Sequence, residues 1–323
     1  MRVLVTGGAG YIGSVCVDEL MRAGHEVVVF DNLSEGHRAA IHSDARLIVG
    51  DLGDLEGLHR VFAEVKPQAV IHFAANALVG ESMANPGKYY RNNVGGGLNL
   101  LEAMVAAGVS KIVFSSTCAV YGIPDTLPIT EELPFRPANV YGETKLTFER
   151  MLRWYRQIHG ISFVAFRYFN AAGAIDLFGE HHRIETHLIP NVLKVALGQA
   201  KQCEIFGGDY PTPDGTCVRD YIHVSDLAVA HVSALNPDVS GYYNLGTGHG
   251  FSVREVIAAC EKVTGAKIPS VLKPRRAGDP PSLVADPAKA RRDLGWQAHF
   301  TRIEDIVQTA WDWHRQHPTG YSD

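Results

Sequence analysis

Residues 3–13 read VLVTGGAGYIG, a short apolar run followed by closely spaced glycines. The apolar run predicts a strand over residues 2–6, and the residues after the glycines predict a helix over residues 11–23. Glycines at positions 8, 10 and 13 permit a tight turn and a close approach of the backbone to a ligand. The N–H groups and the positive dipole at the start of a helix favour a phosphate there. This stretch therefore predicts a loop that binds the pyrophosphate of a dinucleotide.

A second strand is predicted over residues 26–30, and Asp31 follows it directly. A carboxylate about 20 residues after such a loop accepts hydrogen bonds from the ribose hydroxyls of NAD, and it repels the extra phosphate of NADP. NAD is therefore the expected cofactor, and a cluster of turn glycines with a solvated aspartate is the alternative explanation. The contacts expected from these two segments are Gly7, Gly10, Tyr11, Ile12, Gly13, Asp31 and Asn32.

Strand and helix patterns alternate through the first half of the chain. The other predicted strands are residues 46–49, 69–73, 111–115 and 162–167, and the predicted helices are residues 55–65, 89–107 and a long segment after Pro137. This alternation is typical of an α/β fold, a Rossmann-type doubly wound parallel sheet. We expect an NAD-binding domain over residues 1–170 and a smaller C-terminal substrate-binding domain over residues 171–323. The boundary is approximate, because segments after residue 170 can return to the first domain.

The composition is that of an ordinary globular protein: 46% of the 323 residues are hydrophobic, 20% are charged, and the formal net charge is −5. This balance offers no basic surface for nucleic acid or for an anionic membrane. No apolar run reaches the roughly 18 residues of a membrane-spanning helix, and no signal peptide is evident. The five cysteines lack the Cys-x-x-Cys spacing of a zinc site, which favours free thiols in the cytoplasm.

The ends of the predicted strands supply further positions at the cofactor, because ligands of such sheets bind at the carboxyl ends of the strands. Asp51 follows the third strand and is expected near the adenine, with a helix cap or turn residue as the alternative. Asn92 is expected near a ribose, with a buried structural asparagine as the alternative. These further expected contacts are Asp51, Leu52, Phe73, Ala74, Ala75, Asn92, Ser115, Tyr141, Lys145 and Tyr168.

A candidate catalytic group combines Tyr141 and Lys145, which share one face of the long predicted helix, with Thr117 after the fifth strand. A free tyrosine has a pKa of about 10, and the positive charges of the lysine and of an oxidised nicotinamide favour its phenolate. The phenolate can take a proton from a sugar hydroxyl while hydride leaves the same carbon, with Thr117 bonded to the reacting oxygen. A surface pair on a helix is the alternative for Tyr141 and Lys145, since their spacing often arises by chance.

Together these motifs resemble the extended short-chain dehydrogenase/reductases, and within them the family of UDP-glucose 4-epimerases, essentially from end to end. Residues 209–224, DYPTPDGTCVRDYIHV, carry the most specific part of this resemblance. The other matching segments are residues 71–74, 79–82, 114–122, 141–145, 167–170, 205–207, 243–246, 274–276 and 278–279. The resemblance implies an isomerase that retains NAD, oxidises C4 of a UDP-hexose, lets the 4-keto sugar turn over and returns hydride to its other face.

The resemblance also implies a site for the UDP end of the substrate. Asn170 and Leu188 would approach the diphosphate and uridine, and Phe206 would pack beside the uracil. Two arginines would hold the diphosphate, since their planar forks bind phosphate oxygens in pairs, and an aspartate would accept a ribose hydroxyl. Surface salt bridges are the alternative for the arginines and a core position is the alternative for the phenylalanine. The full set is Asn170, Leu188, Phe206, Arg219, Arg276 and Asp279, with Thr117 and Tyr141 at the hexose.

Four positions depart from the pattern of this family. Thr117 stands where serine is frequent, Ala77 where some members have a lysine near the cofactor phosphates, and His187 where some have asparagine. Leu283 matches a tyrosine that limits substrate size in some members. The smaller leucine leaves two readings open: an epimerase of UDP-glucose and UDP-galactose, or one that acts on UDP-GlcNAc and UDP-GalNAc or another UDP-sugar.

Other classes of function are less well supported by the residues. A 4,6-dehydratase follows its threonine with an acidic pair, whereas Cys118 and Ala119 follow Thr117 here. A non-catalytic NAD-binding regulator usually lacks the tyrosine and lysine. We expect a homodimer formed through the helices near residues 89–107 and 138–159, although the apolar face of the second is equally suited to the core. That face consists of Phe148, Met151, Leu152 and Tyr155.

Two local patterns are interpreted as structural. Residues 246–250, GTGHG, look like a second phosphate loop, but we predict a strand-to-helix turn followed by a capping box from Ser252 to Glu255. Three histidines lie close together, at positions 181, 182 and 187, without a known motif or an evident set of carboxylates or cysteines. We therefore expect no metal site at His181, His182 and His187.

Overall fold

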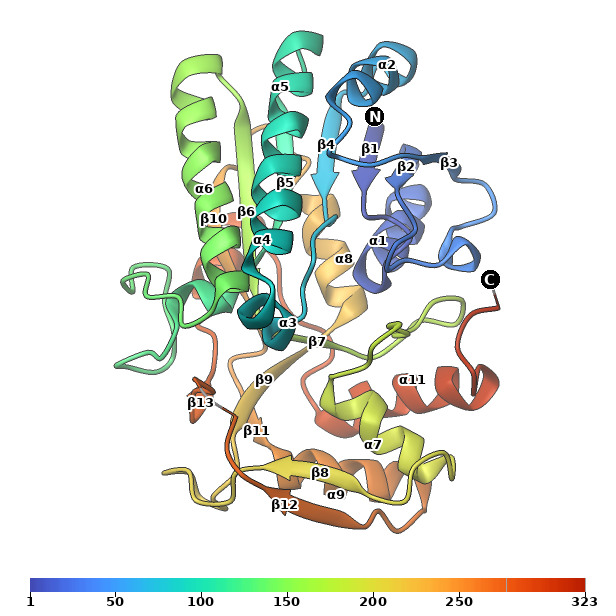
Figure 1. Ribbon diagram of the computed structural model, residues 1–323, viewed down its shortest axis with the longest axis vertical. Helices are drawn as coiled ribbons and strands as arrows, with labels where there is room; N and C mark the ends of the chain where they lie inside the picture. Colours follow the sequence, from blue (N-terminus) through green and yellow to red (C-terminus); the bar gives the residue numbers. More distant parts are fainter. Residues whose placement is uncertain (277, 323) are drawn as a thin grey trace.

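The computed structural model describes residues 1–276 and 278–322, and its larger part is built on a sheet of seven parallel strands (Figure 1). The strand order is β10-β6-β5-β4-β1-β2-β3. This arrangement confirms the predicted α/β Rossmann-type fold. The strands are β1 (Arg2–Thr6), β2 (Glu26–Asp31), β3 (Arg46–Val49), β4 (Ala69–His72), β5 (Lys111–Thr117), β6 (Ser162–Tyr168) and β10 (Gly241–Leu245).

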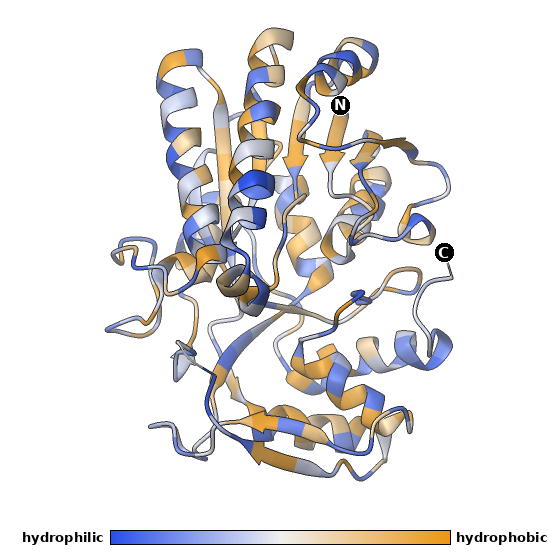
Figure 2. Ribbon diagram, in the orientation of Figure 1, coloured by the Kyte–Doolittle hydropathy of each residue, from blue (hydrophilic) through white to orange (hydrophobic). Residues whose placement is uncertain are grey.

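Helices cover both faces of this sheet, and the alternation of side chains along β1 shows why. Val3 and Val5 pack into one core with α1 (Tyr11–Arg22) and α8 (Val224–Ser233). Leu4 points to the other face and packs into the core formed with α2 (Leu55–Val65), α5 (Gly97–Ala107) and α6 (Val140–His159). A strand that is buried on both faces has a continuous run of apolar residues, and residues 3–5 form such a run. Figure 2 shows that hydrophobic residues also predominate in the other strands of the large sheet.

The C-terminal half of the chain also contributes to the large sheet. Strand β10 pairs in parallel with β6 at the edge of the sheet, with Gly241 opposite Val164. Helix α8, which precedes β10, packs against α1. Residues beyond 171 therefore return to complete the larger part of the molecule.

The smaller part faces the carboxyl ends of the large sheet, as the arrowheads in Figure 1 show. Its sheet has the order β11-β9-β13, with β7 also paired to β9, and a second sheet joins β8 and β12. Its strands are β7 (Asn170–Ala172), β8 (Cys203–Phe206), β9 (Val218–His223), β11 (Gly250–Ser252), β12 (Ser270–Lys273) and β13 (Ser282–Leu283). Its helices α7 (Leu188–Ala196), α9 (Val253–Thr264) and α11 (Ile303–Gln316) share one apolar core.

The predicted helix over residues 89–107 differs from the structure in detail. The chain forms α4 (Pro86–Tyr89), a π-helical segment (Tyr90–Gly96) and then α5. The short elements that remain are α3 (Val79–Ala84), α10 (Ala288–Leu294) and two 3-10 turns, Arg38–Ala40 and Cys118–Tyr121. Within residues 1–276 and 278–322, no helix has the length and apolar content needed to cross a membrane.

Candidate active site

The glycine loop between β1 and α1 is closed too tightly for a side chain at Gly7 or Gly13. Gly7 has a φ of +75°, and a Cβ on it would lie 2.4 Å from the backbone nitrogen of Ala74. A Cβ on Gly13 would lie 2.2 Å from the carbonyl oxygen of Gly7. Helix α1 begins at Tyr11, and the first N–H groups of a helix have no acceptor within the helix. The loop thus has the close backbone and the helix N-terminus that a pyrophosphate requires, so these residues fit a dinucleotide.

Asp31 lies at the end of β2 and is hydrogen-bonded to the same loop. Its carboxylate accepts the N–H of Ala9 at 3.0 Å and the N–H of Leu33 at 2.8 Å. Burial raises the pKa of the Asp31 carboxyl above its usual value, while these two N–H groups counteract the shift. Next to it, Asn32 donates to Asp51 at 2.7 Å, and Asp51 also accepts the N–H of Gly53. Asp51 therefore stabilises a turn at the edge where a nucleoside would lie, and buried Leu52 follows it.

The segment after β4 lies directly beside the glycine loop. The N–H groups of Phe73 and Ala74 both donate to the carbonyl of Thr6, at 2.9 and 3.1 Å. Ala75 continues this segment, whose three residues are only partly buried. The structure therefore joins the carboxyl ends of β1 and β4 through the backbone of this segment.

Asn92 lies in the π-helical segment, an irregularity that is frequent at functional sites. Its amide donates to Asn93, whose own amide donates to Asn76 after β4 and to Thr144 on α6, each at 3.0 Å. The buried structural asparagine is thus Asn93, whereas Asn92 is partly exposed beside it. The sequence analysis did not identify Asn93, because a tandem pair of asparagines gives no indication of which one is buried.

The three predicted catalytic residues meet at the carboxyl end of β5. Thr117 ends that strand, and its side chain hydrogen-bonds to Tyr141 on the first turn of α6. Lys145, one turn later, donates to the carbonyl oxygen of Ser115 at 2.7 Å, and its Nζ lies 5.8 Å from the centre of the Tyr141 ring. The hydroxyl of Ser115 is bonded to the hydroxyl of Tyr168 on the neighbouring strand β6. The spacing of the tyrosine and lysine therefore places both over one strand end.

Burial shifts both titratable groups of this trio toward their neutral forms. It raises the pKa of Tyr141 to about 12, although the hydrogen bond from Thr117 lowers it in part. It lowers the pKa of Lys145 to about 7, although the charge of Glu149 raises it in part. The phenol is therefore protonated in the chain by itself at neutral pH. A positive charge close to the ring is needed to favour the phenolate.

A buried ion pair lies beneath these residues. Arg167 on β6 donates to both oxygens of Glu149 on α6, at 3.0 and 2.7 Å, and its side chain is 1% exposed. Ser116 donates to the same carboxylate at 2.6 Å, and Tyr121 accepts from Arg167. This network fixes α6 to β5 and β6, so it holds Lys145 and Tyr141 in place. Neither Glu149 nor Arg167 was predicted as part of a site.

The residues expected at the UDP end lie in the smaller part, and two pairs of them are in contact with each other. Arg219 on β9 forms an ion pair with Asp279 at 2.6 Å. The guanidinium of Arg276 lies 3.9 Å from the centre of the Phe206 ring at the end of β8. Asn170 is the first residue of β7 and Leu188 the first of α7.

Leu283 connects the two ends of this site. It pairs with Arg219 through β13 and β9, and its side chain belongs to the same buried cluster as Cys118, the residue after Thr117, and Phe169. It is 8% exposed. Ala77 is exposed beyond the end of β4.

The second glycine-rich stretch, residues 246–250, already has an anionic partner in the protein. The carboxylate of Asp220 accepts the N–H groups of Thr247 and Gly248 at 2.8 and 3.0 Å, and that of Ala285 at 3.1 Å. The predicted capping box between Ser252 and Glu255 is confirmed at the start of α9. A phosphate would have to displace Asp220, so this stretch is a structural turn.

The expectation that the histidines lack carboxylate neighbours was wrong. His182 and His187 face Glu180 and Glu185, and one ligand atom from each of these four residues lies within 4.8 Å of all the others. His181 instead stacks on His37, with ring centres 4.7 Å apart. The carboxylates were overlooked because they belong to the same short loop as the histidines without matching a known motif.

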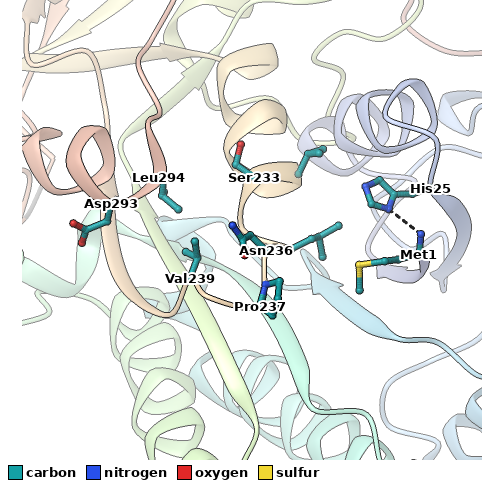
Figure 3. A pocket seen from close by; sticks show the side chains of 10 residues that line it. Met1, His25, Ser233, Asn236, Pro237, Val239, Asp293 and Leu294 are labelled. Carbon is teal, nitrogen blue, oxygen red and sulfur yellow. Dashed lines mark hydrogen bonds between the residues drawn. The ribbon is translucent and has the colours of Figure 1, made fainter.

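A hollow of about 520 Å³ opens near the amino ends of the strands of the large sheet, away from the carboxyl ends where the candidate site lies (Figure 3). Met1 and His25 line one side, and Asn236, Val239 and Leu294 are among the residues on the other. None of the residues predicted to bind cofactor or substrate lines it. The hollow is therefore separate from the candidate active site.

Comparison with known proteins agrees with this geometry. The family described as the NAD dependent epimerase/dehydratase family matches residues 3–246. A UDP-glucose 4-epimerase from Halalkalibacterium halodurans is 52% identical, with 100% of this chain and 98% of that protein covered. A crystal structure of a UDP-glucose 4-epimerase at 50% identity superposes with a TM-score of 0.97 over 100% of both chains. The Bifidobacterium longum UDP-glucose 4-epimerase, in complex with NAD+ and UDP, is 44% identical with a TM-score of 0.95 and coverage of 99% and 100%. The chain belongs to the NAD-dependent epimerase/dehydratase family.

Proposed function

We propose that this chain is a UDP-glucose 4-epimerase, an isomerase that interconverts UDP-galactose and UDP-glucose with a retained NAD. The observation that carries the proposal is the meeting of Thr117, Tyr141 and Lys145 at the carboxyl end of β5, in the same sheet as the strand that leads into the glycine loop, in a chain similar over its whole length to UDP-glucose 4-epimerases. The larger part of the molecule, residues 1–170 together with α8 and β10, would hold NAD, and the smaller part would hold the UDP-sugar.

NAD would lie across the carboxyl edge of the large sheet. The glycine loop and the first turn of α1, with Gly7, Gly10, Tyr11, Ile12 and Gly13, would bind its pyrophosphate. Asp31 and Asn32 would bind the adenosine ribose, with Asp51 and Leu52 beside the adenine. Phe73, Ala74, Ala75 and Asn92 would line the path to the nicotinamide, which Ser115, Tyr141, Lys145 and Tyr168 would surround.

Bound NAD supplies a hydride acceptor, and later the hydride donor, at C4 of the hexose. Tyr141 would take the proton of the C4 hydroxyl, and Thr117 would hold the reacting oxygen through its hydroxyl. Lys145 would favour the phenolate of Tyr141 by its positive charge and would bind the cofactor ribose. When the sugar has turned over, Tyr141 would return the proton to the oxygen as the second epimer forms.

The UDP end requires a firm hold, because the hexose must turn over while the nucleotide stays in place. Arg219 and Arg276 would bind the diphosphate, Phe206 the uracil and Asp279 a ribose hydroxyl. Asn170 and Leu188 would complete this end. The ion pair of Arg219 with Asp279 and the stacking of Arg276 on Phe206 would have to open to admit the diphosphate and the uracil.

Exposed apolar side chains on α5 and α6 favour a homodimer. Trp154 and Ile158 on α6 are 61% and 67% exposed, and Leu98 on the adjoining α5 is 43% exposed. By contrast, Phe148 and Leu152 lie in the core. We infer that a second copy of the chain covers this surface. The five cysteines are free and buried, which fits a reducing cytoplasm, where the reaction would link the pools of two nucleotide sugars.

Incubation of purified protein with UDP-galactose, without added NAD, tests the proposal. We expect UDP-glucose to form, and we expect NAD to be released when the protein is denatured. If folded protein supplied with NAD converts no UDP-galactose, the 4-epimerase assignment is wrong. Activity on UDP-GlcNAc in a parallel reaction would favour the alternative in which Leu283 leaves room for an N-acetyl group.

A further inference from the structure

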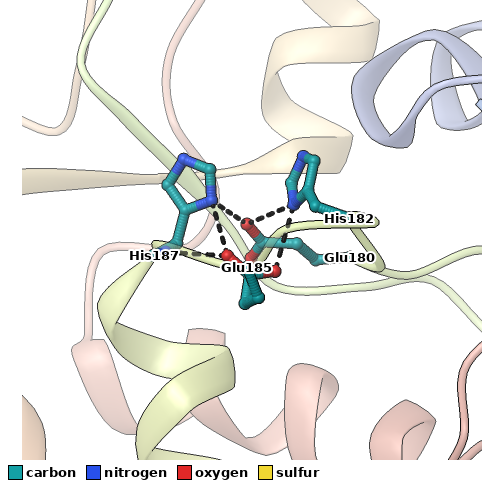
Figure 4. Close-up of side chains that lie close together, drawn as sticks. All are labelled: Glu180, His182, Glu185 and His187. Carbon is teal, nitrogen blue, oxygen red and sulfur yellow. Dashed lines mark hydrogen bonds and ion pairs between the residues drawn. The ribbon is translucent and has the colours of Figure 1, made fainter. Parts of the chain in front are cut away.

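The loop that joins β7 to α7 gathers two carboxylates and two imidazoles around one point (Figure 4). The side chains of Glu180 and Glu185 are only 6% and 4% exposed, and those of His182 and His187 are 30% and 46% exposed. Both histidines turn Nδ1 toward the carboxylates. None of these four residues belongs to the proposed catalytic trio.

The nitrogen of each histidine lies as close to both glutamates as neighbouring ligands of a metal ion lie to one another. Nδ1 of His187 lies 2.9 Å from an oxygen of each glutamate. Nδ1 of His182 lies 3.1 Å from Glu185 and 3.6 Å from Glu180. A tetrahedral ion with bonds of about 2.0–2.2 Å separates neighbouring ligand atoms by about 3.3 Å. The four nitrogen–oxygen separations, 2.9–3.6 Å, bracket this value, and one ligand atom from each residue lies within 4.8 Å of the others, so side-chain rotations bring the four groups to a common ion.

The charges also favour a divalent cation. Two nearly buried carboxylates that face each other need compensating positive charge. A divalent ion with two neutral imidazoles balances both carboxylates, and imidazole ligands suit Zn²⁺ and related transition metals better than Mg²⁺ or Ca²⁺, which prefer oxygen. Two protonated histidines would also balance the charge, so hydrogen-bonded ion pairs without metal are the competing explanation.

We propose that Glu180, His182, Glu185 and His187 form a structural site for a divalent transition-metal ion, for which Zn²⁺ is the probe. Four protein ligands fill a tetrahedral shell and leave no position for a substrate, as in other structural zinc sites. The edge of the His182 ring lies against Tyr11, with ring centres 6.2 Å apart, and Tyr11 is the first residue of α1. His187 directly precedes α7. The ion would therefore fasten the start of α7 to the cofactor loop.

Metal analysis of the full chain tests this site independently of catalysis. Protein dialysed against chelator is loaded with Zn²⁺, dialysed against metal-free buffer and analysed for zinc. We expect about one equivalent per chain and a higher Tm with zinc. The double variant His182→Gln/His187→Gln should retain almost none. His249→Gln, which removes an exposed histidine in the 246–250 turn, should retain the full equivalent.

Single variants and a spectroscopic probe keep the test decisive if the double variant does not fold. His182→Gln alone should weaken zinc binding by more than the roughly 10–100-fold caused by loss of an outer partner of a metal ligand. Co²⁺ bound to the unaltered chain should give the intense visible absorption of tetrahedral coordination. Less than a tenth of an equivalent of zinc, equal zinc in the double variant, or an octahedral Co²⁺ spectrum would each show that the cluster is an ion-pair network. None of these results would affect the 4-epimerase proposal.

Discussion

At the cofactor end of the proposed site, the shape of the site is already formed by the protein alone. At the UDP end, the charged side chains contact other side chains of the protein. Gly7 and Gly13 form a cradle that no Cβ can enter, and Lys145 is bonded to the end of β5. Arg219, by contrast, is paired with Asp279, and Arg276 lies on Phe206. Under the proposed function, the cofactor would enter a preformed site, while the diphosphate and uracil of the substrate would have to displace side chains that already contact each other.

The largest effect on activity is expected from Tyr141→Phe, at the cofactor end of the proposed site. This variant keeps the ring but lacks the hydroxyl that takes the C4 proton, so kcat on UDP-galactose should fall by about 10²–10⁴-fold. The NAD released on denaturation should be unchanged, because the glycine loop and Asp31 remain. A kcat within tenfold of that of the unaltered protein would show that another group is the base.

At the UDP end, Arg219→Met should raise KM for UDP-galactose by about 10–150-fold. This range is equivalent to the roughly 1.5–3 kcal/mol of a charged hydrogen bond. Arg275→Met is the matched control. Arg275 belongs to the same segment as Arg276, but its ion pair with Asp209 lies at the surface. Steady-state kinetics of both variants check this prediction. An equal increase in KM for both would mean that Arg219 has no specific role at the diphosphate.

The lowered pKa of Lys145 leads us to expect that the stability of the cofactor-free chain depends on pH. Burial lowers its pKa from an ordinary value of 10.5 to about 7, so the unfolded state binds more protons between these values. The cost of burying the charged amine is full below pH 7 and is relieved as pH rises from 7 to 10.5. Lys145→Met should therefore stabilise the chain more at pH 6 than at pH 9, by about 1–3 kcal/mol in denaturant unfolding. The same gain at both pH values would contradict the lowered pKa.

Asp31→Asn should relax the preference between the two dinucleotides. Loss of the charge removes repulsion of a 2′-phosphate, so the ratio of NADP to NAD affinity should rise by about tenfold, or 1.4 kcal/mol. Ala9 and Leu33 donate to different oxygens of Asp31, so the amide keeps only one of these two hydrogen bonds, and circular dichroism of the variant checks that the chain stays folded. Titration of stripped protein with each cofactor measures the ratio. An unchanged ratio would indicate that Asp31 supports only the loop.

The smallest effect is expected from Leu283→Met, which keeps the volume of a side chain packed between the two ends of the site. Activity on UDP-galactose should change by less than tenfold, because volume-conserving substitutions usually cost less than about 1.5 kcal/mol. Leu283→Tyr provides the contrast and should lower the activity on UDP-GlcNAc relative to UDP-galactose. If the tyrosine leaves this ratio unchanged, Leu283 does not limit the size of the hexose.

The sequence specified the cofactor end more fully than the UDP end. Strand β1 and the glycine loop are continuous in the chain, and Tyr141 and Lys145 share a helix face, so local pattern places them. The positions of Arg219, Asp279 and Phe206 came only from resemblance, since loops join the elements that carry them. The partnership of Glu149 with Arg167 and the clustering of Glu180 with His187 needed the tertiary structure, because no periodicity indicates which buried or loop side chains face each other.

The measurement that tests the central claim most directly is the fate of hydrogen at C4. UDP-galactose with deuterium at C4 is incubated with the protein in ordinary water, and the UDP-glucose product is analysed by NMR and mass spectrometry. If Tyr141 removes the hydroxyl proton while hydride leaves and returns within one closed site, the deuterium stays at C4 of the product. Replacement of that deuterium by hydrogen from water would mean that C4 is deprotonated, and the account of this active site would be contradicted.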